Sequence, residues 1–96
     1  MADYALSNKA DEDLTEIYSF SYHRFGEARA DAYLIALEEC FSLLAEQPLL
    51  GRSIELIRAD YLRYEHASHT IFYKRTADGI LVIRVLHQSM DPGPHL

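Results

Sequence analysis

The sequence is short of residues that would cross-link a fold. It contains one cysteine, Cys40, and no tryptophan among 96 residues. A single cysteine cannot form an internal disulfide, so packing must hold the fold, which fits a reducing compartment. The sequence also lacks a basic start with an apolar segment, as in a signal peptide, and an apolar run of about 18 residues that could span a membrane. We therefore expect a cytoplasmic protein.

Positive charge is scarce in the first half of the chain. Residues 1–47 contain 3 Lys and Arg against 10 Asp and Glu, whereas residues 48–96 contain 6 against 5. Nonspecific nucleic-acid binding depends on many Lys and Arg contacts to phosphates, so the formal net charge of −6 argues against it as the main activity. Any anion-facing surface should lie in the C-terminal half.

A first helix is expected after a short strand at residues 4–7, from apolar residues that recur at intervals of three and four. Ser7 or Asn8 is a suitable N-cap, and Gly26 ends the apolar stripe. Acidic residues occupy the first turns, where the helix dipole favours them: Asp11, Glu12 and Asp13.

A second apolar stripe, which includes Cys40, begins directly after Gly26 and ends at Gln47. Pro48 follows, and the residue before a proline is disfavoured in a helix. Because so few residues separate the two helices, they should form an antiparallel hairpin.

The apolar period changes from about 3.6 residues to about 2 after Gly51. Three β-rich runs follow at residues 61–66, 70–75 and 80–87, and Asp78-Gly79 is a hairpin-turn signal between the last two. Sequential antiparallel pairing is the simplest topology. The sequence therefore predicts a single α+β domain, residues 1–96, in which a helical hairpin packs on a small antiparallel sheet in the order β-α-α-β-β-β.

Arg84 is the unusual residue of the last strand. It occupies a predicted row that also contains Ile80, Val82 and Leu86. A guanidinium in such a row needs a carboxylate, backbone carbonyls or an anionic ligand, because an unpaired buried charge is costly. The sequence leaves open whether Arg84 is structural or faces a partner.

The histidines allow two interpretations. His66 and His69 have H-x-x-H spacing, but they flank a predicted turn and no cysteine is near to complete a tetrahedral site, so no metal is expected. His69 and His87 are candidates for an acid–base pair near neutral pH, or for structural histidines bonded to the backbone. Nucleophile-elbow and phosphate-loop motifs are absent from the sequence, and no cofactor is expected.

Short motifs along nearly the whole chain resemble the ParE toxins of bacterial toxin–antitoxin modules, in the wider ParE/RelE fold group. They include Leu6-Ser7, Phe25-Gly26, Pro48 with Gly51-Arg52, Ser68-His69, Phe72-Tyr73, and Arg84-Val85-Leu86-His87 with Met90-Asp91. The resemblance implies the same helical-hairpin fold. It also implies a non-catalytic toxin that inhibits DNA gyrase and is neutralised by a ParD-like antitoxin.

The resemblance directs attention to the C-terminal part of the chain. Toxicity and partner contacts are expected from Arg84, His87, Gln88, Met90, Asp91, His95 and Leu96. Residues 92–96 are expected to form a mobile tail that orders on contact with a partner. The antitoxin-facing candidates are Arg52, Arg63 and Tyr73.

Two other functions remain open at this point. One is a RelE-like toxin that cleaves ribosome-bound mRNA with Arg84 and neighbouring basic residues, and the other is an inactive interaction module of the same fold. The RelE-like ribonucleases, which the chain resembles more distantly, are typically strongly basic. The acidic balance of this chain therefore favours the gyrase inhibitor.

Overall fold

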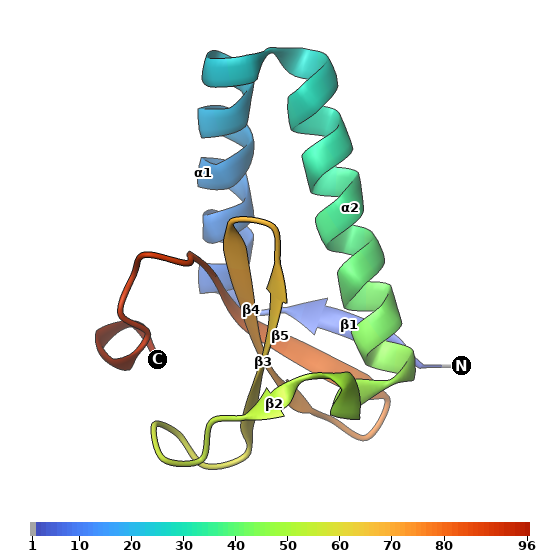
Figure 1. Cartoon of the computed structure of the whole chain (residues 1–96). Helices are drawn as coiled ribbons and strands as arrows, with labels where there is room; N and C mark the ends of the chain where they lie inside the picture. Colours follow the sequence, from blue (N-terminus) through green and yellow to red (C-terminus); the bar gives the residue numbers. More distant parts are fainter. Residues whose placement is uncertain (1) are drawn as a thin grey trace.

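A pair of helices stands on one five-stranded sheet in residues 2–96, the part of the chain that the computed structural model describes (Figure 1). The elements are β1 (Asp3–Leu6), α1 (Asn8–Phe25), α2 (Glu27–Glu46), β2 (Arg52–Ser53), β3 (Tyr61–His66), β4 (His69–Arg75) and β5 (Gly79–His87). Two 3-10 helices, η1 (Pro48–Leu50) and η2 (Gly93–His95), follow α2 and β5. The predicted α+β class and element order are confirmed, and β2 is a short additional strand.

The sheet has the strand order β1-β5-β4-β3-β2. Antiparallel pairing joins β3, β4 and β5 in sequence, as predicted, and β2 pairs antiparallel with β3. By contrast, β1 pairs parallel with β5 and so brings residues 3–6 beside residues 79–82. The helical hairpin covers one face of the sheet, and its turn projects beyond the strands (Figure 1).

Local capping fixes both ends of α1. The Oγ of Ser7 accepts a hydrogen bond from the Ala10 N–H at 3.0 Å, as expected of an N-cap serine. Gly26 ends the helix by donating its N–H to the Tyr22 carbonyl at 2.9 Å. Its φ of 90° suits glycine, and α2 begins at the next residue. The hairpin turn is therefore very short.

The main core lies between the hairpin and the sheet. Its largest fully buried side chains are Tyr73, Phe41, Leu37, Leu44, Ile71, Ile80 and Val82. Burial of a large apolar side chain contributes about 1.5–3 kcal/mol, so this cluster is the chief source of stability. Cys40 is buried in it, and this burial raises the pKa of the thiol. No helix within residues 2–96 combines the length and apolar character needed to cross a membrane.

A β-bulge changes the alternation of β5. Tyr73 pairs with Val82, but Phe72 pairs with Arg84, so Ile83 is an extra residue in the strand. Val85 therefore joins Val82 in the main core. The prediction of one row from Ile80 to Leu86 is wrong for this reason, because strict alternation has no place for the extra residue.

A second, smaller cluster contains Ile54, Phe72 and Leu86, with Tyr61 and Leu96 packed against it. The tail that was expected to be mobile folds back onto this cluster. The Nη1 of Arg84 donates to the His95 carbonyl at 3.2 Å. Arg58 donates to the main-chain oxygen of Leu96. These contacts hold the end of the chain beside the sheet, which the sequence pattern of prolines and glycine did not indicate.

Candidate partner-binding groove

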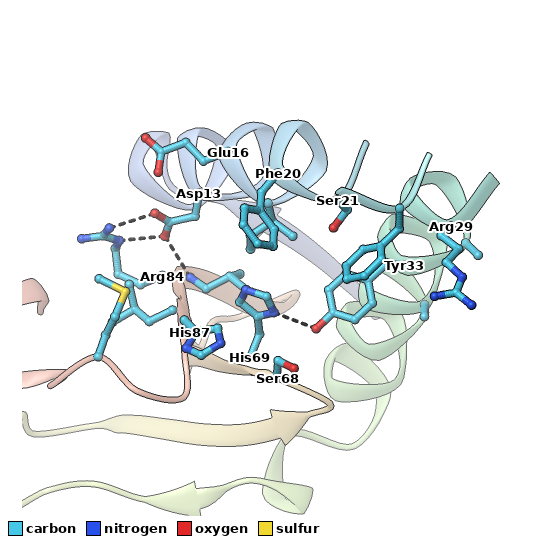
Figure 2. A pocket seen from close by; sticks show the side chains of 17 residues that line it. Asp13, Glu16, Phe20, Ser21, Arg29, Tyr33, Ser68, His69, Arg84 and His87 are labelled. Carbon is cyan, nitrogen blue, oxygen red and sulfur yellow. Dashed lines mark hydrogen bonds and ion pairs between the residues drawn. The ribbon is translucent and has the colours of Figure 1, made fainter. Parts of the chain in front are cut away.

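A groove of about 770 Å³ lies between the helical hairpin and the neighbouring ends of β4 and β5 (Figure 2). Both helices and the last two strands contribute to its lining. Its lining includes Asp13, Glu16, Ile17, Phe20, Phe25, Arg29, Tyr33, His69, Arg84, Val85, Leu86, His87 and Met90.

The groove carries large apolar side chains that water reaches. Phe20 is 65% exposed and Phe25 is 52% exposed on α1, and Met90 is 39% exposed after β5. Contiguous exposed apolar groups of this kind on a soluble protein mark surfaces that another molecule covers. Phe20 and Phe25 belong to the C-terminal half of α1, which continues past the edge of the sheet (Figure 1).

Arg84 and Asp13 form a nearly buried ion pair at one end of the groove. The Nε and Nη2 of Arg84 each donate to a different oxygen of the Asp13 carboxylate, both at 2.8 Å. Their side chains are only 14% and 10% exposed. The hydrogen bonds to Asp13 raise the pKa of the guanidinium above its ordinary value. Arg84 is therefore held by an internal carboxylate, and it also lines the groove.

The position of Asp13 explains why the pair forms there. The Val85 N–H points away from β4, on the edge of β5 that β1 covers only as far as Val82. The Asp13 carboxylate accepts this N–H at 3.0 Å. The sequence pattern alone indicates an ordinary acid of the first helical turns at Asp13. Its spacing from Ala10 and Ile17 was the available signal, because it places a carboxylate on the apolar stripe of the helix.

His69 and His87 meet on the floor of the groove, as the acid–base interpretation requires. They are register partners across β4 and β5, and their ring centroids are 5.5 Å apart. The Nδ1 of His69 lies 2.6 Å from the Tyr33 hydroxyl, a contact that the sequence did not reveal (Figure 2). Burial, then the neighbouring His87 and His66, lowers the pKa of His69, and Asp13 opposes this effect. His69 is therefore poorly suited to hold a proton at neutral pH.

Comparison with known proteins places the chain in a family. A family model described as "ParE toxin of type II toxin-antitoxin system, parDE" matches residues 4–92. The chain belongs to the ParE toxin family. Toxin ParE1 of Caulobacter vibrioides is 40% identical over 96 residues, covering 100% of this chain and 99% of that protein. Toxin ParE1 of Mycobacterium tuberculosis is 40% identical over 89 residues, covering 92% and 91%.

The fold of this ParE toxin also matches a solved structure. A chromosomal ParDE TA system from P. aeruginosa contains a chain with a TM-score of 0.75 and 17% sequence identity. The match covers 91% of this chain and 96% of that chain. At this level of identity the likeness supports the fold alone.

The three antitoxin-facing candidates do not lie in the groove. Arg52 is 72% exposed on β2 and donates to Glu65 at 2.5 Å. Arg63 lies over the Phe72 ring, with its guanidinium carbon 5.8 Å from the ring centroid. Tyr73 is fully buried in the core, so its side chain offers no surface to an antitoxin. That prediction is wrong because Tyr73 faces the helices and not solvent.

Tyr73 has a structural role at the end of the hairpin. Its hydroxyl donates to the Pro48 carbonyl at 2.5 Å and accepts the Gly51 N–H at 3.0 Å. A Cβ at Gly51 would lie 2.1 Å from this hydroxyl oxygen. Gly51 is thus required by a close approach, and the two residues together fix the chain where it leaves α2 and enters β2.

The C-terminal candidates divide between two locations. Arg84, His87 and Met90 line the groove, whereas His95 and Leu96 are next to the second cluster. The other two candidates, Gln88 and Asp91, are exposed in the segment between the end of β5 and the 3-10 helix η2. No group of three or more His, Cys, Asp or Glu residues in the described chain could hold a metal ion.

Proposed function

We propose that this ParE-family toxin is neutralised by a ParD-like antitoxin that fills the groove, and that the free toxin inhibits DNA gyrase in the cytoplasm. The exposed apolar lining of the groove is the observation that carries the first part. A partner segment that covers Phe20, Phe25 and Met90 removes from water apolar surface that the fold leaves open.

Gyrase inhibition is supported over RNA cleavage by the state of Arg84. The RNA-cleaving alternative depends on this residue to stabilise charge on a phosphate, but its Nε and Nη2 already bond to Asp13 and its Nη1 donates to the His95 carbonyl. The chain is also acidic, with a net charge of −6. A toxin that binds a protein target does not need the dense cationic surface that holds a polynucleotide.

The proposed surface for gyrase begins at the turn after β5 and continues along the tail. Gln88 and Asp91 are exposed there, and His95 and Leu96 lie next to the second cluster. The groove lining does not include residues 91–96. We therefore assign the groove to the antitoxin and the tail to the toxic contact, with Met90 between them.

Two assays test the function. Purified DNA gyrase is given increasing amounts of antitoxin-free toxin, and supercoiling and cleaved DNA complexes are scored together. Loss of supercoiling is the expected result. If a folded sample leaves gyrase unaffected but cuts mRNA on translating ribosomes, the RNA-cleaving alternative replaces the proposal. Growth arrest on expression without antitoxin separates both from an inactive module.

Antitoxin binding is tested with a matched pair of serine substitutions. Phe20→Ser lies in the groove, and Leu49→Ser changes a residue that is 72% exposed outside it. Removal of an aromatic side chain at the centre of an interface should weaken antitoxin binding about tenfold or more, whereas the control should bind normally. Equal affinities for the two variants in calorimetry would place the antitoxin elsewhere.

A further inference from the structure

The segment between β2 and β3, residues 54–60, forms a turn that lies beside the tail. Ile54, at its start, belongs to the second cluster, against which Leu96 also packs. Arg58, near its end, donates to the main-chain oxygen of Leu96, and its guanidinium carbon lies 5.8 Å from the centroid of the Tyr61 ring. Two segments that are distant in the sequence are therefore joined at one place on the surface (Figure 1).

Main-chain hydrogen bonds fix the 54–60 turn. The Ile54 carbonyl accepts the N–H groups of Ile57 and Arg58 at 2.8 and 2.9 Å, which is the pattern of a single helical turn. The Ile54 N–H in turn donates to the Tyr61 carbonyl at 3.0 Å and closes the segment. Asp60 has a φ of 67°, which aspartate adopts more readily than most residues. The turn is thus pre-formed, so little backbone freedom is lost when a partner binds it.

This pre-formed turn presents apolar side chains to water. Leu56 is fully exposed and Ile57 is 47% exposed, and neither belongs to the two core clusters. Single exposed apolar residues are ordinary on protein surfaces. Here, however, two adjacent ones project from a fixed turn that is bonded to the segment assigned to the toxic contact.

The charges around Leu56 and Ile57 favour a basic partner. Glu55 and Asp60 are exposed within the turn, and Asp91 is exposed just before the tail. The cation of the turn, Arg58, is already engaged with the Leu96 oxygen and the Tyr61 ring. An enzyme that acts on DNA carries Lys and Arg along the path of the DNA, so it complements these acidic groups.

We propose that the 54–60 turn and the tail form one surface that binds gyrase. Leu56 and Ile57 enter an apolar pocket with a basic rim, and Arg58 is the positioning residue that keeps the two segments together. This inference rests on the proposed function and adds residues 54–60 to the toxic contact. The groove lining contains no residue of this turn, so the surface is separate from the one assigned to the antitoxin.

The double variant Leu56→Ser with Ile57→Ser tests the apolar contact. Leu49→Ser is the matched control, because Leu49 is 72% exposed but lies in η1, before β2. Binding of each toxin to purified DNA gyrase is measured by surface plasmon resonance, and inhibition is measured in the supercoiling assay. The double variant should bind about tenfold more weakly or worse, since a few buried anchors carry most of the affinity of an interface. The control should match the parent.

The outcomes separate this inference from the proposed function. If the parent inhibits gyrase and the double variant inhibits it equally well, the turn is not part of the surface, and the proposed function stands. An equal loss in Leu49→Ser would also overturn the inference, because the effect would not be specific to the turn. If the parent, folded by circular dichroism, does not bind gyrase, both proposals fall.

Substitutions of Arg58 test its positioning role. Arg58→Met keeps an apolar stem but cannot donate to Leu96, whereas Arg58→Lys keeps a charged donor. The Met variant should bind gyrase about fivefold more weakly, and its Leu96 amide, bonded to the Pro92 carbonyl, should exchange faster. The Lys variant should recover most of the affinity. Unchanged binding and exchange in Arg58→Met would overturn the joining of the two segments.

Discussion

Substitution of Asp13 by alanine should be among the most destabilising single changes of a polar residue in α1. The change leaves the Arg84 guanidinium, 14% exposed, without its carboxylate, and leaves the Val85 N–H without an acceptor. Breaking a buried ion pair by removing one partner costs about 3–5 kcal/mol. Because water reaches part of this pair, we expect the lower end of that range, about 3 kcal/mol.

The loss is large compared with the stability of a domain of this size. Small domains unfold with about 5–15 kcal/mol, so Asp13→Ala removes a substantial fraction of the total. For a domain of this length it should lower the melting temperature by at least 10 °C, at roughly 4–8 °C per kcal/mol. Urea denaturation followed by circular dichroism measures the free energy directly. Glu12→Ala, an exposed neighbour, should stay within about 0.5 kcal/mol of the parent.

The double variant Asp13→Leu with Arg84→Met tests the physical reason. Replacing both charges by apolar groups of similar size removes the unpaired guanidinium but leaves the Val85 N–H without an acceptor, so this variant should recover part of the stability lost in Asp13→Ala. The reasoning is refuted if Asp13→Ala costs less than about 1 kcal/mol, or if the double variant is as unstable as the single one.

Three further predictions concern other parts of the molecule. Gly51→Ala should destabilise the protein by about 2 kcal/mol or more, because the new Cβ would clash with the Tyr73 hydroxyl. Urea denaturation should show a smaller loss of stability when the same change is made in the Tyr73→Phe variant. The pKa of His69 is lowered in the folded protein, so its contribution to stability should be complete above the unfolded pKa of about 6.5 and be lost progressively as the pH falls below it. His69→Gln should show a weaker dependence, and the same pH slope in both proteins would exclude His69 as the cause. Deletion of residues 91–96 should abolish gyrase inhibition and preserve antitoxin binding, and full inhibition by the truncated toxin would contradict the assignment of the tail.

Local sequence signals were sufficient for most of the fold. Gly26 ends the first helix because glycine readily adopts a positive φ, and Pro48 ends the second because the residue before a proline is disfavoured in a helix. Asp78-Gly79 marks the last hairpin, so these boundaries follow from nearby residues. The parallel pairing of β1 with β5 could not be predicted in this way. It joins segments more than 70 residues apart, and no local pattern encodes which edge of the sheet a first strand will choose.

The candidate site was harder to predict than the fold. Arg84 is identifiable from the sequence because it interrupts an apolar row. Its partner Asp13 has only the pattern of an ordinary acid at a helix start, and the pairing depends on the bulge at Ile83, which no sequence signal indicated. The contact of Tyr33 with His69 likewise depends on how the hairpin lies over the sheet. Contacts between side chains of distant elements can be predicted only when the tertiary arrangement is known, whereas helix ends and turns can be predicted from nearby residues.

The parallel pairing of β1 with β5 also sets when the toxin can fold during its own synthesis. Residues 3–13 are synthesised well before their partners at residues 79–85. Until then α1 and α2 lack most of the sheet beneath them, because contacts that distant in sequence form only when both segments are present. The sheet therefore stays incomplete until residues 79–85 have been made, and the proposed antitoxin, if it is already present, can bind the groove as soon as the groove forms.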